Sequence, residues 1–320
     1  MTLRWDPPED ETSYLEAYAA MDPRLTPQSK YPYRRGVARL PDLPYAYADK
    51  VLVPAGKSSF LYEDGMKPYR GYSSILGALV QAYFPGIVTL PNGQEDVAWT
   101  WKHYHYALDP TKKYNHMAEK IQVLSWNYFD MHRENSTECI AIVNELAKRK
   151  VQDMHYEARV KSVRNWFGDR KIWMNKSQAR DMLFEPWQYL QNPPQFVGND
   201  ARCYTAMVAW WTHVEYLKRH EAAKKRREEM KGGSHRQGSI PLALVRQKEK
   251  VKTGVEPSMF AISKKMRTLD EPVNGSPWIN EGAKIRGTKY PEKYKQVHGE
   301  DSNPDTAPFD PEVAVLAGQG

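Results

Sequence analysis

Lysine and arginine side chains crowd one part of this 320-residue sequence, where they could neutralise the phosphates of a nucleic acid. The segment 202–268 holds 16 Lys and Arg residues against 6 Asp and Glu residues, a net charge of +10, whereas the whole chain has a net charge of +7. The remainder therefore carries about −3. Because phosphate neutralisation supplies most nucleic-acid affinity, this segment predicts a surface that binds a polyanion.

The side chains expected to contact phosphates all lie in or beside this segment. We predict DNA contacts from Lys218, Arg219, Lys224, Lys225, Arg226, Arg227, Lys231, His235, Arg236, Arg246, Lys248, Lys264, Lys265 and Arg267. The block 224–227 also has the composition of a nuclear localisation signal, although a solvated helix face has the same composition. Two short helices around Gly254 suggest a helix-turn-helix, but the pattern does not identify the helix that enters a groove.

Carboxylates could support a different chemistry, which is DNA cleavage with two metal ions. That reaction needs carboxylates that converge on the strands of a sheet. Five acidic residues lie close together in the sequence, but on helical patterns without β-branched runs beside them: Asp153, Glu157, Asp169, Asp181 and Glu185. The sequence therefore favours a non-catalytic role over a metal-dependent nuclease.

Other catalytic and metal-binding patterns are missing from the sequence. His103, His105 and His116 have no metal-site spacing, and neither a phosphate-binding loop nor a Gly-x-Ser-x-Gly turn occurs. Cys139 and Cys203 both fall on amphipathic helical patterns, which predicts buried, reduced thiols. We expect no catalytic residue, no metal and no cofactor.

Apolar residues at helical spacing predict a mainly α fold of amphipathic helices with one long basic helix. We expect helices over 72–83, 117–131, 139–168, 177–183, 202–230, 240–252 and 258–266, and a broken helix over 278–297. A short strand is expected at 87–90, and 97–107 fits a strand or a helix. The basic residues within 148–164 fit a solvated face or a second phosphate-contacting surface.

The two ends of the chain differ from this helical part. Residues 1–69 contain nine prolines and eight tyrosines, which predicts a Pro/Tyr-rich, largely irregular or disordered arm with one short helix near 11–20. Residues 70–297 form the expected helical domain, and 298–320 the expected acidic, flexible tail. The longest apolar runs, near 75–80 and 206–211, are too short to span a membrane, and the start of the sequence has no secretory signal.

An ordered series of motifs resembles the plant transposase family of the Ptta/En/Spm type. The series comprises 150–159, Trp187-x-Tyr189-Leu190, the basic block 222–227 before His235 and Gly238-Ser239, 254–260, 278–281, 290–294 and 308–313. The resemblance covers about 117–320, and the order and spacing of the motifs carry it. The first hundred residues match no pattern of the family.

The resemblance implies a nuclear, transposon-derived protein that binds DNA or assists a separate catalytic transposase. Family members continue into a coiled coil, so we expect a homodimer to depend on a C-terminal element that this chain lacks. The aromatic content, with 10 Trp and 20 Tyr, leaves a helical protein-interaction scaffold as an alternative function.

Overall fold

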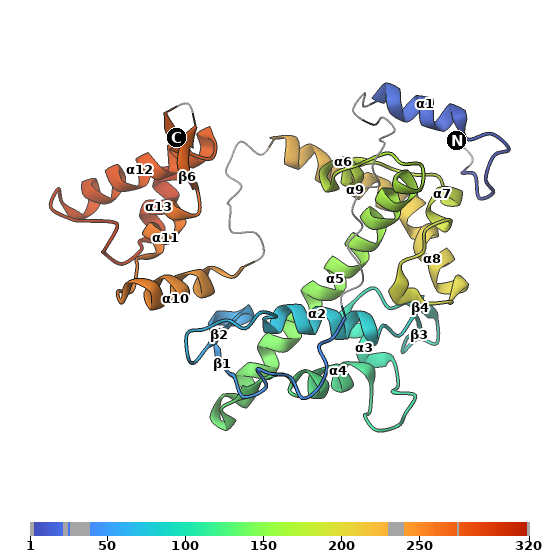
Figure 1. Cartoon of the computed structure of the whole chain (residues 1–320), viewed down its shortest axis with the longest axis horizontal. Helices are drawn as coiled ribbons and strands as arrows, with labels where there is room; N and C mark the ends of the chain where they lie inside the picture. Colours follow the sequence, from blue (N-terminus) through green and yellow to red (C-terminus); the bar gives the residue numbers. More distant parts are fainter. Residues whose placement is uncertain (1–2, 22–24, 26–38, 230–239, 274, 319–320) are drawn as a thin grey trace. The chain divides into compact units, whose positions relative to one another are not determined.

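The computed structural model describes residues 3–21, 25, 39–229, 240–273 and 275–318, and this part of the chain is mainly α-helical (Figure 1). The predicted fold class is confirmed. The chain divides into two compact units, of which the first comprises 1–50 and 68–224 and the second comprises 51–67 and 225–320. A segment from the N-terminal arm thus belongs to the same unit as the C-terminal third of the sequence.

The first unit is built from helices with one short antiparallel hairpin. In this hairpin Ile87 pairs with Val97, and the expected strand at 87–90 is confirmed. The elements are α1 (Thr12–Met21), α2 (Tyr72–Ala82), β3 (Ile87–Thr89), β4 (Glu95–Val97), α3 (Trp101–Tyr106), α4 (Met117–Ser125), β5 (Asp130–Met131), η2 (Arg133–Asn135), α5 (Ser136–Asp169), α6 (Lys176–Asp181), α7 (Pro186–Leu190), η3 (Gln195–Val197) and α8 (Ala201–Thr212). Helix α9 (Val214–Glu229) follows α8 and contains the boundary between the units.

Helix α5 is the long central element of the first unit. Its 34 residues extend about 50 Å at 1.5 Å per residue. The first half packs against α2 and α3, and the second half packs against α6 and α7 (Figure 1). Buried residues recur along its whole length, from Cys139 to Gly168. The helix predicted over 139–168 is therefore confirmed, and it organises both ends of the unit.

Aromatic side chains form the core around the second half of α5. Trp166 lies edge-on to Phe184 and to Trp187, with ring centroids 5.1 and 6.1 Å apart. Trp211 of α8 completes this cluster through Tyr189, at 5.3 Å. These rings bury large apolar areas, so they are the main stabilising contacts here.

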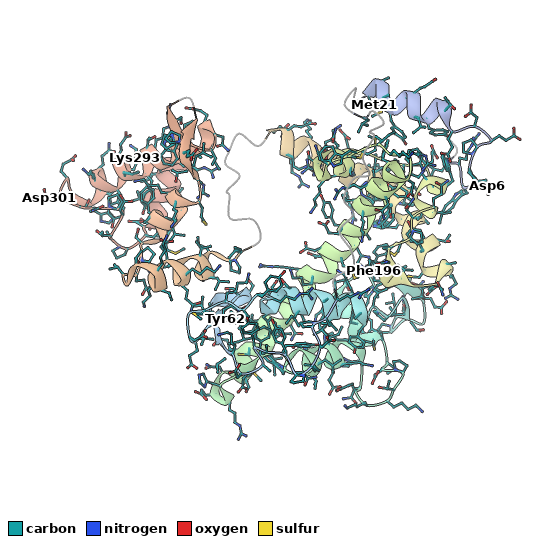
Figure 2. The ribbon with its side chains drawn as sticks, viewed as in Figure 1. Asp6, Met21, Tyr62, Phe196, Lys293 and Asp301 are labelled. Carbon is teal, nitrogen blue, oxygen red and sulfur yellow. The ribbon has the colours of Figure 1, made fainter. Side chains whose placement is uncertain are left out.

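A second aromatic cluster surrounds His155, which is 7% exposed. Phe84 and Phe196, the latter labelled in Figure 2, meet edge-on at 5.0 Å. Trp99 lies 4.7 Å from the imidazole ring of His155. The Nε2 atom of His155 is 3.0 Å from the carbonyl oxygen of Ala98, and its Nδ1 atom is buried without a partner.

One basic residue of the arm 148–164 lies inside the protein. Arg159 is 1% exposed and donates through Nη1 to the carbonyl oxygen of Met182 at 2.8 Å. Its Nη2 atom donates to the carbonyl oxygen of Arg180. Carbonyl oxygens thus replace water around this guanidinium. The sequence left two alternatives for the basic residues within 148–164, a solvated face or a phosphate-contacting surface. Arg159 fits neither of them, because its side chain is buried.

The N-terminal arm contains an ordered part that packs on the first unit. Tyr14 of α1 lies edge-on to Trp187 at 5.3 Å, and the hydroxyl of Tyr18 donates to the Gln188 side chain at 3.1 Å. Glu11 pairs with Arg170, whose guanidinium stacks 3.7 Å above the Trp166 ring. The short helix expected near 11–20 is confirmed, and it is held by aromatic contacts that its own sequence does not reveal.

The described part of the second unit combines the β1–β2 and β6–β7 hairpins with helices α10 to α13. Its elements are β1 (Val51–Pro54), η1 (Gly56–Ser58), β2 (Phe60–Tyr62), α10 (Leu242–Thr253), α11 (Met259–Lys265), β6 (Thr268–Val273), β7 (Ser276–Trp278), α12 (Glu281–His298) and α13 (Pro311–Gly318). Strand β1 pairs antiparallel with β2, with Leu52 opposite Tyr62. The side chain of Gln247 from α10 bonds to both the backbone N–H and the carbonyl of Tyr62, which attaches this hairpin to α10.

Two C-terminal features differ from the sequence-based expectation. Helix α12 runs through Gly287 and Pro291 without a break, and Trp278 belongs to β7 instead of to this helix. Within the expected flexible tail, α13 packs on α12, with Val313 and Ala317 1% and 3% exposed. These two apolar residues are four positions apart, so they present one face to the core formed with Phe260, Tyr290 and Tyr294.

Replacing Arg159 with alanine should destabilise the protein. The variant loses buried packing and leaves two buried carbonyls without a donor, so we expect the free energy of unfolding to fall by about 2–4 kcal/mol. Denaturant unfolding measures this change. The control Lys161→Ala removes an exposed cation from the same helix and should change stability by under about 0.5 kcal/mol. Equal effects of the two variants would contradict the buried position of Arg159.

The stability should also depend on pH through His155. Burial lowers the pKa of His155 to about 4, with a smaller contribution from His103. The unfolded chain, with an ordinary pKa near 6.5, therefore binds the proton more readily than the folded chain. Stability should be complete above about pH 6.5 and fall by up to about 3 kcal/mol as pH drops to 4. In the variant His155→Gln the loss of stability between about pH 6.5 and pH 4 should be smaller, and urea unfolding at several pH values measures this loss. The same pH dependence in the variant and the parent protein would refute the role of His155.

Candidate nucleic-acid interface

The Trp-rich helix and the basic helix are separated by a break at His213. The sequence predicts one helix over 202–230, but His213 has an extended backbone with φ −70° and ψ 143°. Its Nδ1 atom accepts from the backbone N–H of Glu215 at 3.2 Å, so the imidazole caps the first turn of α9. Trp211 remains buried on α8, whereas none of the residues of α9 is fully buried.

Four basic side chains of α9 lie on one face of the helix. Lys218 and Lys225 are seven residues apart, as are Arg219 and Arg226, so at about 100° per residue all four fall within roughly 120° of arc. The four side chains are exposed. We call these four residues the α9 basic face. The two pairs are separated by about 10 Å along the axis.

Acidic residues only partly neutralise the α9 basic face. Lys218 pairs with Glu215 at 3.0 Å and Lys225 pairs with Glu229 at 3.9 Å. Both lysine side chains remain about 70% exposed, and such surface pairs contribute little energy that a phosphate would have to replace. In the described part of the chain Arg226 has no acidic partner, and Arg219 stacks on the Trp210 ring at 5.6 Å.

The helix pair predicted around Gly254 is present as α10 and α11. Gly254 ends α10 in the left-handed conformation, with φ 74° and ψ −6°, where a side chain would add strain. The side chain of Ser258 accepts from the N–H of Ala261 at 3.0 Å and begins α11. Its hydroxyl donates to the carbonyl of Pro304 at 3.1 Å, which anchors this turn to the segment before α13.

Most of the predicted site residues on α10 and α11 have acidic neighbours. Arg246 lies 3.2 Å from Glu256, and hydrogen bonding to Lys250, together with the Lys250 and Arg246 charges, lowers the pKa of this carboxyl. Lys264 lies 3.5 Å from Asp305, and Lys265 lies near Glu249. Lys248 is exposed. The pKa of the nearby Lys67 amine is lowered by the burial of Lys67 and by the charge of Lys248. Lys248 and Lys67 thus add positive charge beside the β1–β2 hairpin.

The remaining predicted contacts differ in position. Lys224 and Arg227 are half-buried on α9, away from the α9 basic face. Arg267 follows α11 and donates through Nη1 to the carbonyl of Ser263 at 3.1 Å. Lys231, His235 and Arg236 lie outside the residues that the structure describes. The sequence did not point to Arg286 of α12, which lies near Arg267. Burial and the charge of Arg286 both lower the pKa of Arg267.

Three of the five acidic residues considered for cleavage have separate polar partners. Glu157 pairs with Lys176, Asp181 pairs with Arg180 at 3.0 Å, and Glu185 accepts from the backbone N–H of Arg4 at 2.9 Å. Within the described ranges no three His, Cys, Asp or Glu side chains gather as a metal site. Cys139 and Cys203 are both buried and free of disulfides, as predicted.

The histidines near α3 have local contacts. His116 caps α4, with its Nδ1 atom accepting from the N–H of Glu119 at 3.0 Å. His105 lies against His116 with ring centroids 4.6 Å apart, and burial together with His116 lowers the pKa of His105.

None of the helices in the described ranges is long and apolar enough to cross a membrane.

The fold and the exposed cations define a mainly helical protein with a basic surface helix, and comparison with known proteins finds a relative among transposable-element proteins. The chain is 22% identical over 299 residues to the autonomous transposable element EN-1 mosaic protein of maize (Zea mays). The predicted resemblance to the En/Spm type is confirmed as a distant relationship. No protein-family model and no solved structure matches the chain.

The extent of this similarity corrects one expectation. It covers 92% of the chain, so it reaches into the first hundred residues, for which the sequence motifs suggested no relative. The chain spans about half the length of the relative, 47%. The chain is thus related to a transposable-element protein over nearly all of its own length.

Replacing Ser258 should loosen the turn that positions α11. Ser258→Ala removes both the cap of α11 and the buried bond to Pro304, so we expect a loss of about 1–2 kcal/mol in the free energy of unfolding. Ser258→Thr keeps the hydroxyl and should recover most of this loss. Chemical denaturation of both variants measures the effect, and an Ala variant as stable as the parent protein would refute the cap.

Proposed function

We propose that this protein is a DNA-binding, non-catalytic accessory component of a transposon and that it contacts DNA phosphates through the α9 basic face. The observation that carries the proposal is the repeat of exposed cations at Lys218, Arg219, Lys225 and Arg226. The relationship to a transposable-element protein supports DNA as the polyanion, since such elements are themselves DNA.

The geometry of α9 suits a role in phosphate contact. The two pairs of cations are about 10 Å apart, so a single helix can reach phosphates several nucleotides apart. The aromatic contact between Arg219 and Trp210 limits the conformations of that guanidinium before DNA arrives. Phosphate contacts set position and general affinity, whereas recognition of bases requires further side chains.

The accessory role belongs to the same proposal. DNA cleavage would be performed by a separate catalytic transposase, and this chain would hold or orient the DNA in the nucleus. The block 224–227 on α9 would then also serve nuclear import. The carboxylates Glu157, Asp181 and Glu185 support this division of labour because each has a structural partner of its own.

The double variant Lys225→Ala/Arg226→Ala tests the proposal. Loss of two phosphate contacts should weaken binding to a 30-base-pair duplex by about tenfold or more at 50 mM salt. The slope of log affinity against log salt should become shallower by about 1.8, since each contact contributes about 0.9. Fluorescence anisotropy over a series of salt concentrations measures both quantities.

The control variant Lys102→Ala/Lys113→Ala removes the same charge from two exposed lysines of the first unit, outside α9. It should keep the parent salt slope. Equal weakening by both double variants would indicate a general charge effect, and the absence of duplex binding by the parent protein at 50 mM salt would refute the proposed function.

A further inference from the structure

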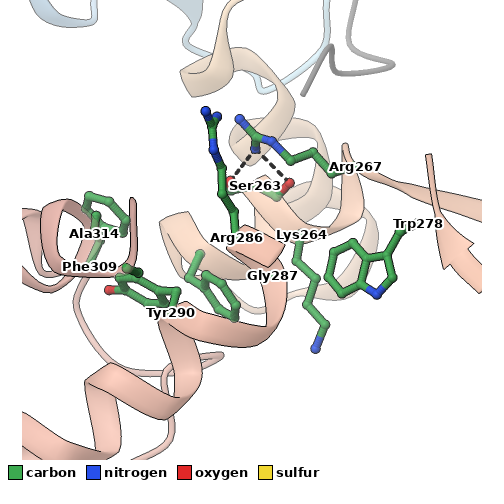
Figure 3. Close-up of a pocket in the computed structure, with 11 residues that line it drawn as sticks. Ser263, Lys264, Arg267, Trp278, Arg286, Gly287, Tyr290, Phe309 and Ala314 are labelled. Carbon is green, nitrogen blue, oxygen red and sulfur yellow. Dashed lines mark hydrogen bonds between the residues drawn. The ribbon is translucent and has the colours of Figure 1, made fainter. Parts of the chain in front are cut away.

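A cavity in the second unit combines aromatic rings with unpaired positive charge. It lies between α11, β7, α12 and α13 and has a volume of about 360 Å³ (Figure 3). This volume is within the range of pockets that hold small organic ligands.

One wall of the cavity is a stack of aromatic rings. Phe260 and Tyr290 are parallel to within 23°, with centroids 4.6 Å apart. Phe309 continues the stack on Tyr290 at 5.5 Å and 12°. Tyr290 is fixed further because its hydroxyl accepts from the backbone N–H of Asp310 at 3.0 Å. A flat apolar ligand would therefore meet a preformed surface.

The Trp278 ring forms another part of the lining because residue 287 is a glycine. A Cβ atom on Gly287 would lie 1.9 Å from Cη2 of Trp278, so any side chain there would displace the indole. The indole is half-buried and thus within reach of a ligand from solvent. This contact also explains why α12 has a glycine in its interior, where the residue lowers helix stability.

Two arginines bring positive charge to the cavity without a matching anion. In Figure 3 the guanidinium groups of Arg267 and Arg286 point to the same side, away from Trp278. Among the described residues Arg286 has no acidic partner, and the Nε atom of Arg267 is buried without an acceptor. Two carboxylates of this unit have other partners: Asp305 lies 3.5 Å from Lys264, and Asp310 lies 2.8 Å from Nε2 of His298 and accepts from the backbone N–H of Val313.

The lack of an anion is energetically unfavourable for the protein alone. Burial and the charge of Arg286 both lower the pKa of Arg267, which means that the protonated forms of the two side chains destabilise each other. A bound dianion would offset this repulsion.

We propose that this cavity binds one unstacked nucleotide, with its base against Trp278 and the aromatic stack and its phosphate on Arg267 and Arg286. Base stacking on aromatic side chains and bidentate arginine contacts to phosphate are the two interactions that such a ligand needs. The nucleotide comes either from a single strand of the DNA that the protein binds or from the free mononucleotide pool. The inference deepens the proposed function and rests on it for the first of these sources.

Binding of dTMP and of a 12-residue oligo(dT) to the full chain, measured by calorimetry, tests the proposal. Arg286→Gln should weaken both ligands at least about tenfold because one charge-assisted phosphate contact is lost. Arg286 is exposed, so this variant should fold normally. Lys284→Gln, which removes the same charge from an exposed position on the same helix, should bind like the parent protein.

The base contact has its own variants. Trp278→Leu should weaken dTMP by about tenfold but leave inorganic phosphate unaffected, since stacking involves only the base. Gly287→Ala should have the same effect through displacement of the indole. Comparable affinity per site for dTMP and oligo(dT) indicates the free nucleotide, whereas binding of oligo(dT) alone indicates a strand.

Several results would overturn the inference. These are the absence of binding by both nucleotide ligands, equal affinity for phosphate and dTMP, or equal effects of Arg286→Gln and Lys284→Gln. Failure of the proposed function gives a different result, because duplex binding would then be absent while dTMP binding persists. The cavity variants should leave duplex binding within about twofold of the parent value, since the α9 basic face is intact.

Discussion

Packing of aromatic side chains against α5 is the interaction on which the first unit depends. Trp166 contacts Phe184 and Trp187, and through them the short helices α6 and α7 share a core with α8. Helices of five or six residues are not stable in isolation, because few hydrogen bonds offset the entropy of forming the first turn. The long helix therefore supplies the surface on which the short ones fold, and α8 in turn determines where α9 begins.

The same constraint separates three uses of arginine. Arg159 lies in the aromatic core, so it must exchange water for carbonyl oxygens. Arg246 lies at a surface where Glu256 neutralises it. Arg226 follows the break at His213, on a helix with no fully buried residue, and its side chain is exposed to solvent. All three arginines lie in segments with several basic residues. Only their tertiary contacts distinguish the structural arginine, Arg159, from Arg226, which is a candidate for ligand contact.

The two proposals use different parts of the chain and different chemistry. Duplex binding requires a convex surface with cations at regular spacing, which α9 provides without any cavity. Nucleotide binding requires a concave site with rings and paired guanidinium groups, which the elements around α12 provide. A protein with both could hold duplex DNA at one surface and an unpaired nucleotide at another.

Much of this fold and part of its candidate site could be predicted from the sequence. The periodic apolar residues of α5 and the charge excess over 202–268 are local patterns, which can be recognised from the sequence alone. The motif order also indicated the distant En/Spm relationship. The break at His213 was not predictable, because histidine is an uncommon cap and both flanking segments favour helix.

Tertiary structure alone decided which charges are available and which residues meet. Arg286 and Arg267 lie 19 positions apart in the sequence and approach only because β6 and β7 return the chain to α11. Trp278 packs on Gly287 for the same reason, and α13 becomes part of a core once Val313 and Ala317 meet Tyr290. The sequence by itself determined the helical class, the basic segment and the family resemblance. Long-range packing decided burial and pairing, because these depend on neighbours that are distant along the chain.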